Sequence, residues 1–168
     1  MQATEKVMKP LQVGDESPDF ALKGASYSTL FQLIREQKIP AFVYFYPADF
    51  SPACTAQACM MRNTVRRESA TNGVVIGVSP QGAGLHRAFQ SIMHLPQQLV
   101  SDRNKEIGRS YGAVGPLGIY RRLSYIISED KRILMMAEGG LAIASHKKLA
   151  KKYFEILQYK HEGDPASK

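Results

Sequence analysis

Two apolar runs joined by a polar helical segment decide the fold of this chain. Residues 41–46 are Ala-Phe-Val-Tyr-Phe-Tyr, and residues 73–78 are Gly-Val-Val-Ile-Gly-Val. Neither run alternates polar with apolar residues, which is typical of strands that are buried on both faces. Residues 52–70 between them are polar and arginine-rich, with a helical pattern. A strand, a helix and a second buried strand predict a right-handed crossover between two parallel strands.

Helices and strands continue to alternate on either side of this unit. The expected elements are a strand at 19–22, a helix capped by Ser28, a helix at 86–93, a strand at 98–100, a helix at 105–111, strands at 123–127 and 133–137, and a last helix capped by Ser145. The segment 128–132 between the last two strands suits an antiparallel hairpin. We therefore predict an α/β fold with a central mixed β-sheet flanked by helices.

The composition predicts one globular domain. The chain has 168 residues, of which 44% are apolar and 22% are charged. A chain of this length buries enough surface to fold without cross-links. Two cysteines are too few for a disulfide-rich secreted scaffold. We expect an N-terminal extension at 1–10, a single domain at 11–160 and a mobile polar tail at 161–168.

Several kinds of partner and location are not expected from this sequence. No stretch has the ~18 consecutive apolar residues of a membrane span, and residues 1–11 lack the apolar core of a signal peptide, so a cytoplasmic protein is expected. No recognition motif for nucleic acid accompanies the net charge of +7. The histidines have no metal-ligand spacing to the cysteines, so neither a metal nor a cofactor is expected.

Cys54 lies where a helix is expected to begin. Ser51 followed by Pro52 is a strong start signal, with the serine as N-cap and the proline as the first helical residue. Cys54 is then the third helical residue, among unpaired backbone N–H groups at the positive end of the helix dipole. Such a position favours the reactive thiolate, which for a free cysteine is only ~3% populated at neutral pH. The alternative is that Cys54 is a small buried apolar residue.

Cys59 follows five positions later on the same expected helix. Five helical residues separate the two Cα atoms by about 8–9 Å, whereas a disulfide needs them within about 7 Å. An intact helix therefore excludes a static bond between the two cysteines. A transient bond requires the first helical turn to unwind. From its position alone, Cys59 is either a resolving thiol or part of the core.

The segment around the cysteines resembles a known family. Pro47-x-x-x-Ser51-x-x-Cys54 matches the Pro-x-x-x-Thr/Ser-x-x-Cys active-site motif of the peroxiredoxins. The spacing Cys54-x4-Cys59 resembles that of the subgroup called PrxQ, or bacterioferritin comigratory protein. The resemblance covers most of the chain. It is carried further by residues 13–20, 43–47, 77–80, 99–102 and 122–127.

This resemblance implies a thioredoxin-like fold and a peroxidase that reduces hydrogen peroxide and small organic hydroperoxides. It implies that Cys54 is the peroxidatic cysteine, which becomes a sulfenic acid. Cys59 would resolve that acid as an intramolecular disulfide after local unfolding. Pro47 would shield the site from water, and Ser51 would hydrogen-bond the thiolate and the peroxide. Thioredoxin or a similar thiol reductant would be the partner of a monomer or weak homodimer.

The resemblance also implies an arginine on the strand after a glycine-rich loop, which stabilises the thiolate and the charge on the departing oxygen. Arg121 and Arg122 are adjacent there, and strand alternation sends their side chains to opposite faces. We assign the role to Arg122, because it precedes Leu-Ser-Tyr-Ile-Ile as the family arginine precedes its strand. Ser51 stands where threonine is commoner in the family, and it retains the hydroxyl.

Two other functions remain open at this point. A non-enzymatic redox sensor or binding module would use the same reactive thiol to switch an interaction. A cysteine hydrolase would pair Cys54 with His86, although no feature of the sequence places that histidine near the thiol. Arg62, Arg66 and Arg67 either raise the positive potential around Cys54 or face water.

Overall fold

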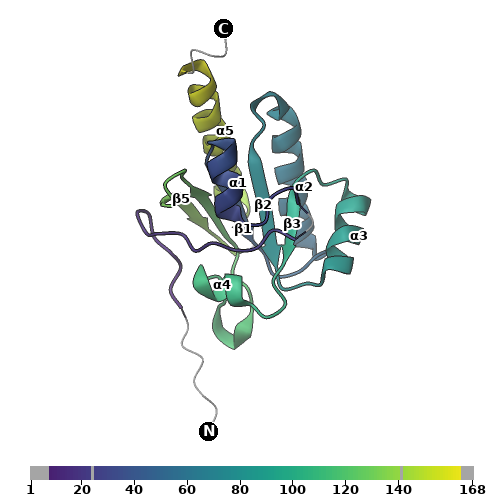
Figure 1. The fold of residues 1–168 in the computed structure, drawn as a ribbon. Coiled ribbons are helices and arrows are strands. Elements are labelled where there is room, and N and C mark those ends of the chain that lie inside the picture. Colours follow the sequence, from purple (N-terminus) through teal and green to yellow (C-terminus); the bar gives the residue numbers. More distant parts are fainter. Residues whose placement is uncertain (1–7, 24, 141, 164–168) are drawn as a thin grey trace.

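A computed structural model describes residues 8–23, 25–140 and 142–163. In this part of the chain, a five-stranded sheet with the strand order β3-β2-β1-β4-β5 is flanked by helices (Figure 1). The elements are α1 (Leu30–Gln37), β1 (Ala41–Phe45), α2 (Pro52–Arg67), the 3₁₀ turn η1 (Ser69–Thr71), β2 (Val74–Ser79), α3 (Ala83–Met93), β3 (Gln98–Ser101), α4 (Glu106–Ser110), the 3₁₀ turn η2 (Pro116–Gly118), β4 (Leu123–Ile127), β5 (Ile133–Glu138) and α5 (Ala144–Gly163). None of the described helices has the length and apolar character needed to cross a membrane.

The sheet is mixed, as the sequence predicts. Strand β1 pairs in parallel with β2, and β2 pairs in parallel with β3. Strand β4 runs antiparallel to β1 and forms an antiparallel pair with β5. The predicted parallel pair and the predicted hairpin are both confirmed. Every residue of β1 is buried, which agrees with its lack of polar alternation.

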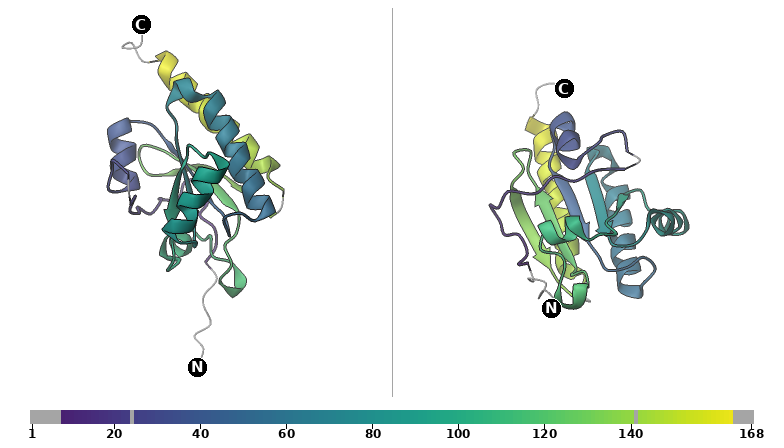
Figure 2. Two further views of the ribbon diagram at one scale, coloured as in Figure 1. Left: turned by 90° about the vertical axis from the view of Figure 1, so that its right-hand side faces the viewer. Right: turned by 60° about the horizontal axis from the view of Figure 1, so that its bottom comes forward.

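The two faces of β1 carry separate halves of the core. Val43 and Phe45 pack with α1 and α4 on one face. Phe42 and Tyr44 pack on the other face with α2, α3 and α5, and that half of the core contains Cys54. Figure 2 shows α1 on one side of the sheet and α2 beside α5 on the other. The helix that carries the cysteines is therefore held against the centre of the sheet.

The strand predicted at 19–22 does not form. Ala21 makes only an isolated bridge to Thr29. The backbone N–H of Leu22 donates to the Ser28 carbonyl oxygen, so this segment folds back onto the chain ahead of α1 and does not join the sheet. Phe20 and Leu22 are buried in the core, but the backbone of the segment pairs locally.

Of the three predicted helix caps, Ser51 is the N-cap of α2, whereas Ser28 and Ser145 are not at the N-cap position of their helices. Thr29, and not Ser28, caps α1, because its hydroxyl accepts the Gln32 N–H at 3.2 Å. Ser145 lies inside the first turn of α5, which begins at Ala144.

The predicted chain ends are only partly within the described residues. Helix α5 continues to Gly163, three residues into the segment 161–168 that was expected as a tail. Residues 1–7 of the expected N-terminal extension and residues 164–168 lie outside the described part of the chain.

Buried polar contacts fix α5 to the sheet. The Tyr153 hydroxyl accepts the Val74 N–H at 2.7 Å and donates to the Pro40 carbonyl oxygen at 2.9 Å. Near the start of α5, His146 is fully buried, and its Nδ1 lies 2.8 Å from the Ser124 hydroxyl on β4. Burial, with a smaller contribution from the charge of Arg122, lowers the pKa of His146 from 6.5 to about 4. The imidazole is therefore neutral in the folded protein near neutral pH.

We expect the free energy of unfolding to fall as the pH drops from about 7 to 5. The pKa of His146 is about 4 in the folded chain and 6.5 in an exposed histidine. Below pH 6.5 the unfolded chain therefore binds a proton at this residue that the folded chain does not bind. The loss from this residue is on the order of 1 kcal/mol. Denaturant unfolding at the two pH values measures it. His146→Asn should lose less stability over the same range, and an equal loss in both proteins would contradict the assignment to His146.

Candidate active site

The start of α2 places Cys54 where the sequence predicts it. Ser51 is the N-cap residue with an extended backbone, Pro52 is the first helical residue, and Cys54 is the third. The Ser51 side chain makes no capping bond to the helix. Its hydroxyl donates to the Ala48 carbonyl oxygen at 3.4 Å, which is the long limit for such a bond. The cap therefore leaves the backbone N–H groups of the first turn without a side-chain acceptor.

The guanidinium group of Arg122 covers the Cys54 sulfur. Its Nη1 and Nη2 atoms each lie 3.4 Å from Sγ. Cys54 is 1% exposed and Arg122 is 7% exposed, so the contact is shielded from water. A cation this close to a sulfur in a buried site stabilises the thiolate over the thiol.

The sheet register explains why these two residues meet. Leu123 lies opposite Phe45 in the antiparallel pair of β4 with β1. The residue before β4, Arg122, therefore lies beside the loop that follows β1 and leads to Cys54. Arg121 points away, and its Nη1 lies 3.9 Å from Glu138 Oε1, with both side chains partly exposed. Of the two adjacent arginines, the structure places Arg122 on the thiol, the residue to which the sequence analysis assigned the role.

Two further contacts hold the Arg122 side chain in place. Its Nη1 donates to Gln57 Oε1 at 2.6 Å, and its Nε donates to the Gly140 carbonyl oxygen at 2.8 Å. Both acceptors are neutral, and no carboxylate of the described residues pairs with this arginine. The positive charge of Arg122 is therefore directed at Cys54 and is not neutralised by an acidic side chain.

Gln57 is a site residue that the sequence analysis did not select. It is fully buried, one helical turn after Cys54, and its oxygen faces Arg122 because a guanidinium can only donate. Residues three apart lie on the same face of a helix. That spacing was the available signal, and the contact with Arg122 could not be deduced without the sheet register.

The second cysteine is close in sequence but is not joined to the first. Cys59 is half-buried, and both thiols are free. Both lie within the continuous helix α2 (Pro52–Arg67). Over five helical residues the Cα atoms are about 8–9 Å apart, which exceeds the span of a disulfide. The structure thus holds the two thiols apart, and the resolving role of Cys59 stays a prediction.

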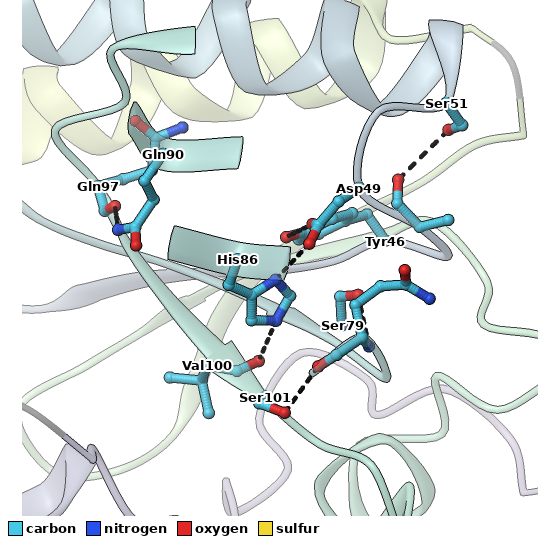
Figure 3. Close-up of polar contacts among 11 residues, drawn as sticks. Tyr46, Asp49, Ser51, Ser79, His86, Gln90, Gln97, Val100 and Ser101 are labelled. Atoms are coloured by element: carbon cyan, nitrogen blue, oxygen red, sulfur yellow. Dashed lines mark hydrogen bonds and ion pairs between the residues drawn. The ribbon is translucent and has the colours of Figure 1, made fainter. Parts of the chain in front are cut away.

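His86 does not approach Cys54, which removes the basis of the cysteine hydrolase. Its Nδ1 lies 2.7 Å from Asp49 Oδ2, and its Nε2 lies 3.3 Å from the Val100 carbonyl oxygen. Figure 3 shows the imidazole ring between these two partners, with the Tyr46 hydroxyl bonded to the same carboxylate. Both ring nitrogens are therefore engaged away from the thiol. Asp49 lies in the active-site loop and was not singled out from the sequence.

Of the arginines that follow the cysteines, Arg66 and Arg67 are exposed, as one of the two expectations had it, and Arg62 is half-buried. Arg62 donates to the Met93 carbonyl oxygen at 2.7 Å, and Arg66 donates to the His94 carbonyl oxygen at 3.0 Å. These carbonyls belong to the C-terminal end of α3, where the helix leaves acceptors unpaired. The two arginines thus join α2 to α3 rather than facing the thiol. Among the described residues, no group of three or more His, Cys, Asp or Glu side chains could hold a metal ion.

Comparison with known proteins agrees with this geometry. Residues 13–136 match the AhpC/TSA family. Peroxiredoxin Q, chloroplastic, of Arabidopsis thaliana is 33% identical over 119 residues, which cover 70% of this chain and 55% of the relative. Peroxiredoxin Q, chloroplastic, of Gentiana triflora is 30% identical over 142 residues, which cover 83% of this chain and 65% of the relative. The chain thus spans between about half and two thirds of the length of these plant relatives.

Solved structures share the fold. Peroxidoxin BcpB of Mycobacterium tuberculosis superposes with a TM-score of 0.72 and 24% identity, covering 90% of this chain and 97% of that one. Peroxiredoxin Q of Xanthomonas campestris superposes with a TM-score of 0.68 and 19% identity, covering 84% of this chain and 90% of that one. At these identities the likeness concerns the thioredoxin-like fold alone. Taken with the sequence match over most of its length, it shows that this chain belongs to the AhpC/TSA family and that the peroxiredoxin Q proteins are among its relatives.

Proposed function

We propose that this protein is a thiol peroxidase that reduces hydrogen peroxide and small organic hydroperoxides through Cys54. In this proposal Cys59 resolves the oxidised sulfur, and a thiol reductant such as thioredoxin restores both thiols. The observation that carries it is the two-point contact of Arg122 with the Cys54 sulfur, in a buried site at the start of a helix. The names of the plant relatives point to the same chemistry.

The first step forms one S–O bond and breaks one O–O bond. The Cys54 thiolate attacks the terminal oxygen of the hydroperoxide, and the other oxygen leaves with the electron pair of the O–O bond. A proton converts that oxygen into water or an alcohol. The sulfur is oxidised to a sulfenic acid, and the peroxide is reduced.

Arg122 has two tasks in this step. A nearby positive charge favours a thiolate, but full ionisation would raise the rate only about thirtyfold above a free thiol, because that thiol is already ~3% ionised. The rest of the acceleration must come from donors that stabilise the charge on the leaving oxygen. The guanidinium has its Nη atoms on the sulfur, so both oxygens of a peroxide that reaches this sulfur, including the leaving one, would lie near these donors. The Ser51 hydroxyl, held only by a long bond to Ala48, is a further donor if it turns toward the peroxide.

Oxidation of Cys54 favours the second step through the same arginine. A sulfenic acid is neutral, so the attraction between Arg122 and the thiolate disappears once the peroxide has been reduced. The first turns of α2 then lose one of the contacts that hold them. Unwinding of this segment allows the Cys59 thiol to attack the Cys54 sulfur, with loss of water and formation of the disulfide. A dithiol reductant then restores both thiols by exchange.

The contacts along α2 indicate where unwinding would stop. Gln97 Nε2 donates to the Ala58 carbonyl oxygen at 3.1 Å, in the second turn of the helix. Arg62 and Arg66 tie the following turns to the end of α3. The part of α2 that contains Cys54 lies before these anchors. We therefore place the boundary between the part that unwinds and the part that stays helical near Ala58.

Replacement of the reacting thiol tests the proposal directly. Cys54→Ser should lose peroxide reduction in the presence of thioredoxin and its reductase, because a serine hydroxyl is not ionised at neutral pH. Peroxide consumption per mole of protein is the measurement. Turnover retained by Cys54→Ser would contradict the proposal. Wild-type protein that consumes one equivalent and then stops, with reductant present, would point to a redox sensor.

The adjacent arginines provide a matched pair of variants. Arg122→Gln should lower the second-order rate of Cys54 oxidation by about 100- to 1,000-fold, the usual effect of removing a donor that stabilises a developing negative charge. Arg121→Gln removes the same charge from a position that faces Glu138, so its rate should stay near the wild-type rate. Rapid-mixing kinetics with excess hydrogen peroxide measures both. Equal rates in the two variants would remove Arg122 from the mechanism.

The second cysteine separates resolution from oxidation. Cys59→Ala should reduce one equivalent of peroxide at the wild-type rate and should then fail to turn over with thioredoxin. Intact-protein mass spectrometry after one equivalent should show the gain of one oxygen in Cys59→Ala and the loss of two hydrogens in the wild type. Full turnover of Cys59→Ala with thioredoxin would make the mechanism one-cysteine and Cys59 a core residue.

A further inference from the structure

A buried polar chain lies under the active-site loop and takes no part in the chemistry described above. Asp49 accepts the Tyr46 hydroxyl on Oδ1 at 2.7 Å, and its Oδ2 lies 2.7 Å from His86 Nδ1 (Figure 3). The side chains of Asp49 and His86 are 0% and 3% exposed. A buried carboxylate is rare unless it is paired, so its presence in this loop requires a reason.

The hydrogen-bond partners of Asp49 and His86 determine where the protons lie in this buried network. The Val100 carbonyl oxygen can only accept, so His86 Nε2 carries a hydrogen. One further proton lies between His86 Nδ1 and Asp49 Oδ2, whichever of the two holds it. With the Tyr46 hydroxyl on the other oxygen, every polar side-chain atom of Asp49 and His86 has a partner. A fully satisfied buried network of this kind is rigid and fixes one conformation.

This network ties the active-site loop to three separate elements. Tyr46 directly follows β1, His86 lies on α3, and Val100 lies on β3. Asp49 is the loop residue in this network; it bonds directly to Tyr46 and His86, and His86 bonds to Val100. The loop therefore cannot shift relative to the sheet or to α3 without breaking buried hydrogen bonds.

The next loop residue shows why such an anchor is needed. Phe50 has a φ of 60°, in the left-handed region, which costs a residue with a side chain about 1–2 kcal/mol. Its ring packs edge-on against Phe89, with ring centres 4.9 Å apart. Phe89 and His86 lie one turn apart on α3, so α3 holds two consecutive loop residues. Ser51, the N-cap of α2, follows immediately.

We infer that Asp49 and His86 are positioning residues for the peroxidase reaction. By fixing the loop, they fix where α2 begins, and hence how the Cys54 sulfur faces Arg122 before peroxide arrives. A misplacement of about 1 Å at a reacting centre lowers a rate about 100-fold. The inference rests on the proposed peroxidase function, and it concerns the bonds of Asp49 rather than its charge.

Three variants test it. Asp49→Ala removes the network and should lower the rate of Cys54 oxidation by hydrogen peroxide about 10- to 100-fold. Asp49→Asn should stay within about threefold of the wild type, because an amide oxygen still accepts from Tyr46 and the amide N–H donates to neutral His86. Tyr153→Phe is the control, since it removes an equally buried hydroxyl from the Val74 and Pro40 contacts, away from the site. It should lower the free energy of unfolding without changing the oxidation rate.

Two measurements keep the outcomes separate. Rapid mixing gives the oxidation rate, and hydrogen exchange of residues 47–59 reports the loop and the start of α2 without any need for activity. Exchange should rise at least tenfold in Asp49→Ala and should stay near wild type in Asp49→Asn and Tyr153→Phe. A wild-type rate in Asp49→Ala overturns the inference, and so does a rate in Asp49→Asn as low as that of Asp49→Ala.

If Asp49→Ala does not fold, the Tyr46→Phe variant decides. It should slow oxidation about tenfold and raise exchange of residues 47–59, and an unchanged rate and exchange overturn the inference. Wild-type protein no faster than a free cysteine refutes the proposed peroxidase instead, and unchanged exchange in Asp49→Ala then refutes the anchor separately.

Discussion

The charge of Arg122 governs the arrangement of the whole site. A guanidinium shielded from water needs an acceptor for its donors, and here the acceptors are the Cys54 sulfur, the Gln57 amide oxygen and the Gly140 carbonyl. These come from two turns of α2 and from the loop after β5. The sheet must therefore bring the end of β1, the start of β4 and the end of β5 to one edge. The antiparallel placement of β4 between β1 and β5 does so.

The elements with strong local signals were predictable from the sequence. The unbroken apolar runs at 41–46 and 73–78 became buried neighbours in the sheet, and Ser51-Pro52 marked the start of α2 to the residue. Strand alternation predicted that only one of Arg121 and Arg122 points inward, and the resemblance to the family selected Arg122. The strand predicted at 19–22 was wrong, because apolar composition predicts burial but does not specify the backbone partner. Here the backbone pairs with residues nearby in the sequence and not with the sheet.

What the sequence could not supply were contacts between distant parts of the chain. Asp49 and His86 are 37 positions apart, and each taken alone is an ordinary polar residue. The same holds for Gln57 and Arg122, which are 65 positions apart. Each pair exists only because the loop after β1, α3 and β4 gather at the same edge of the sheet. Sequence spacing predicts which residues share a face of one helix or strand. It does not predict which residues meet across a crossover connection.

The anchoring of α2 to α3 through Arg62 and Arg66 affects how α2 would re-form in the proposed cycle. Starting a helix is the unfavourable step in helix formation, whereas extending one adds a hydrogen bond for each residue fixed. In the proposed cycle, the anchored turns would stay helical while the segment ahead of them unwinds, so they would serve as a nucleus. The first turns would then re-form by elongation, a process of nanoseconds per residue. Return of the helical conformation would therefore not require a new nucleation step.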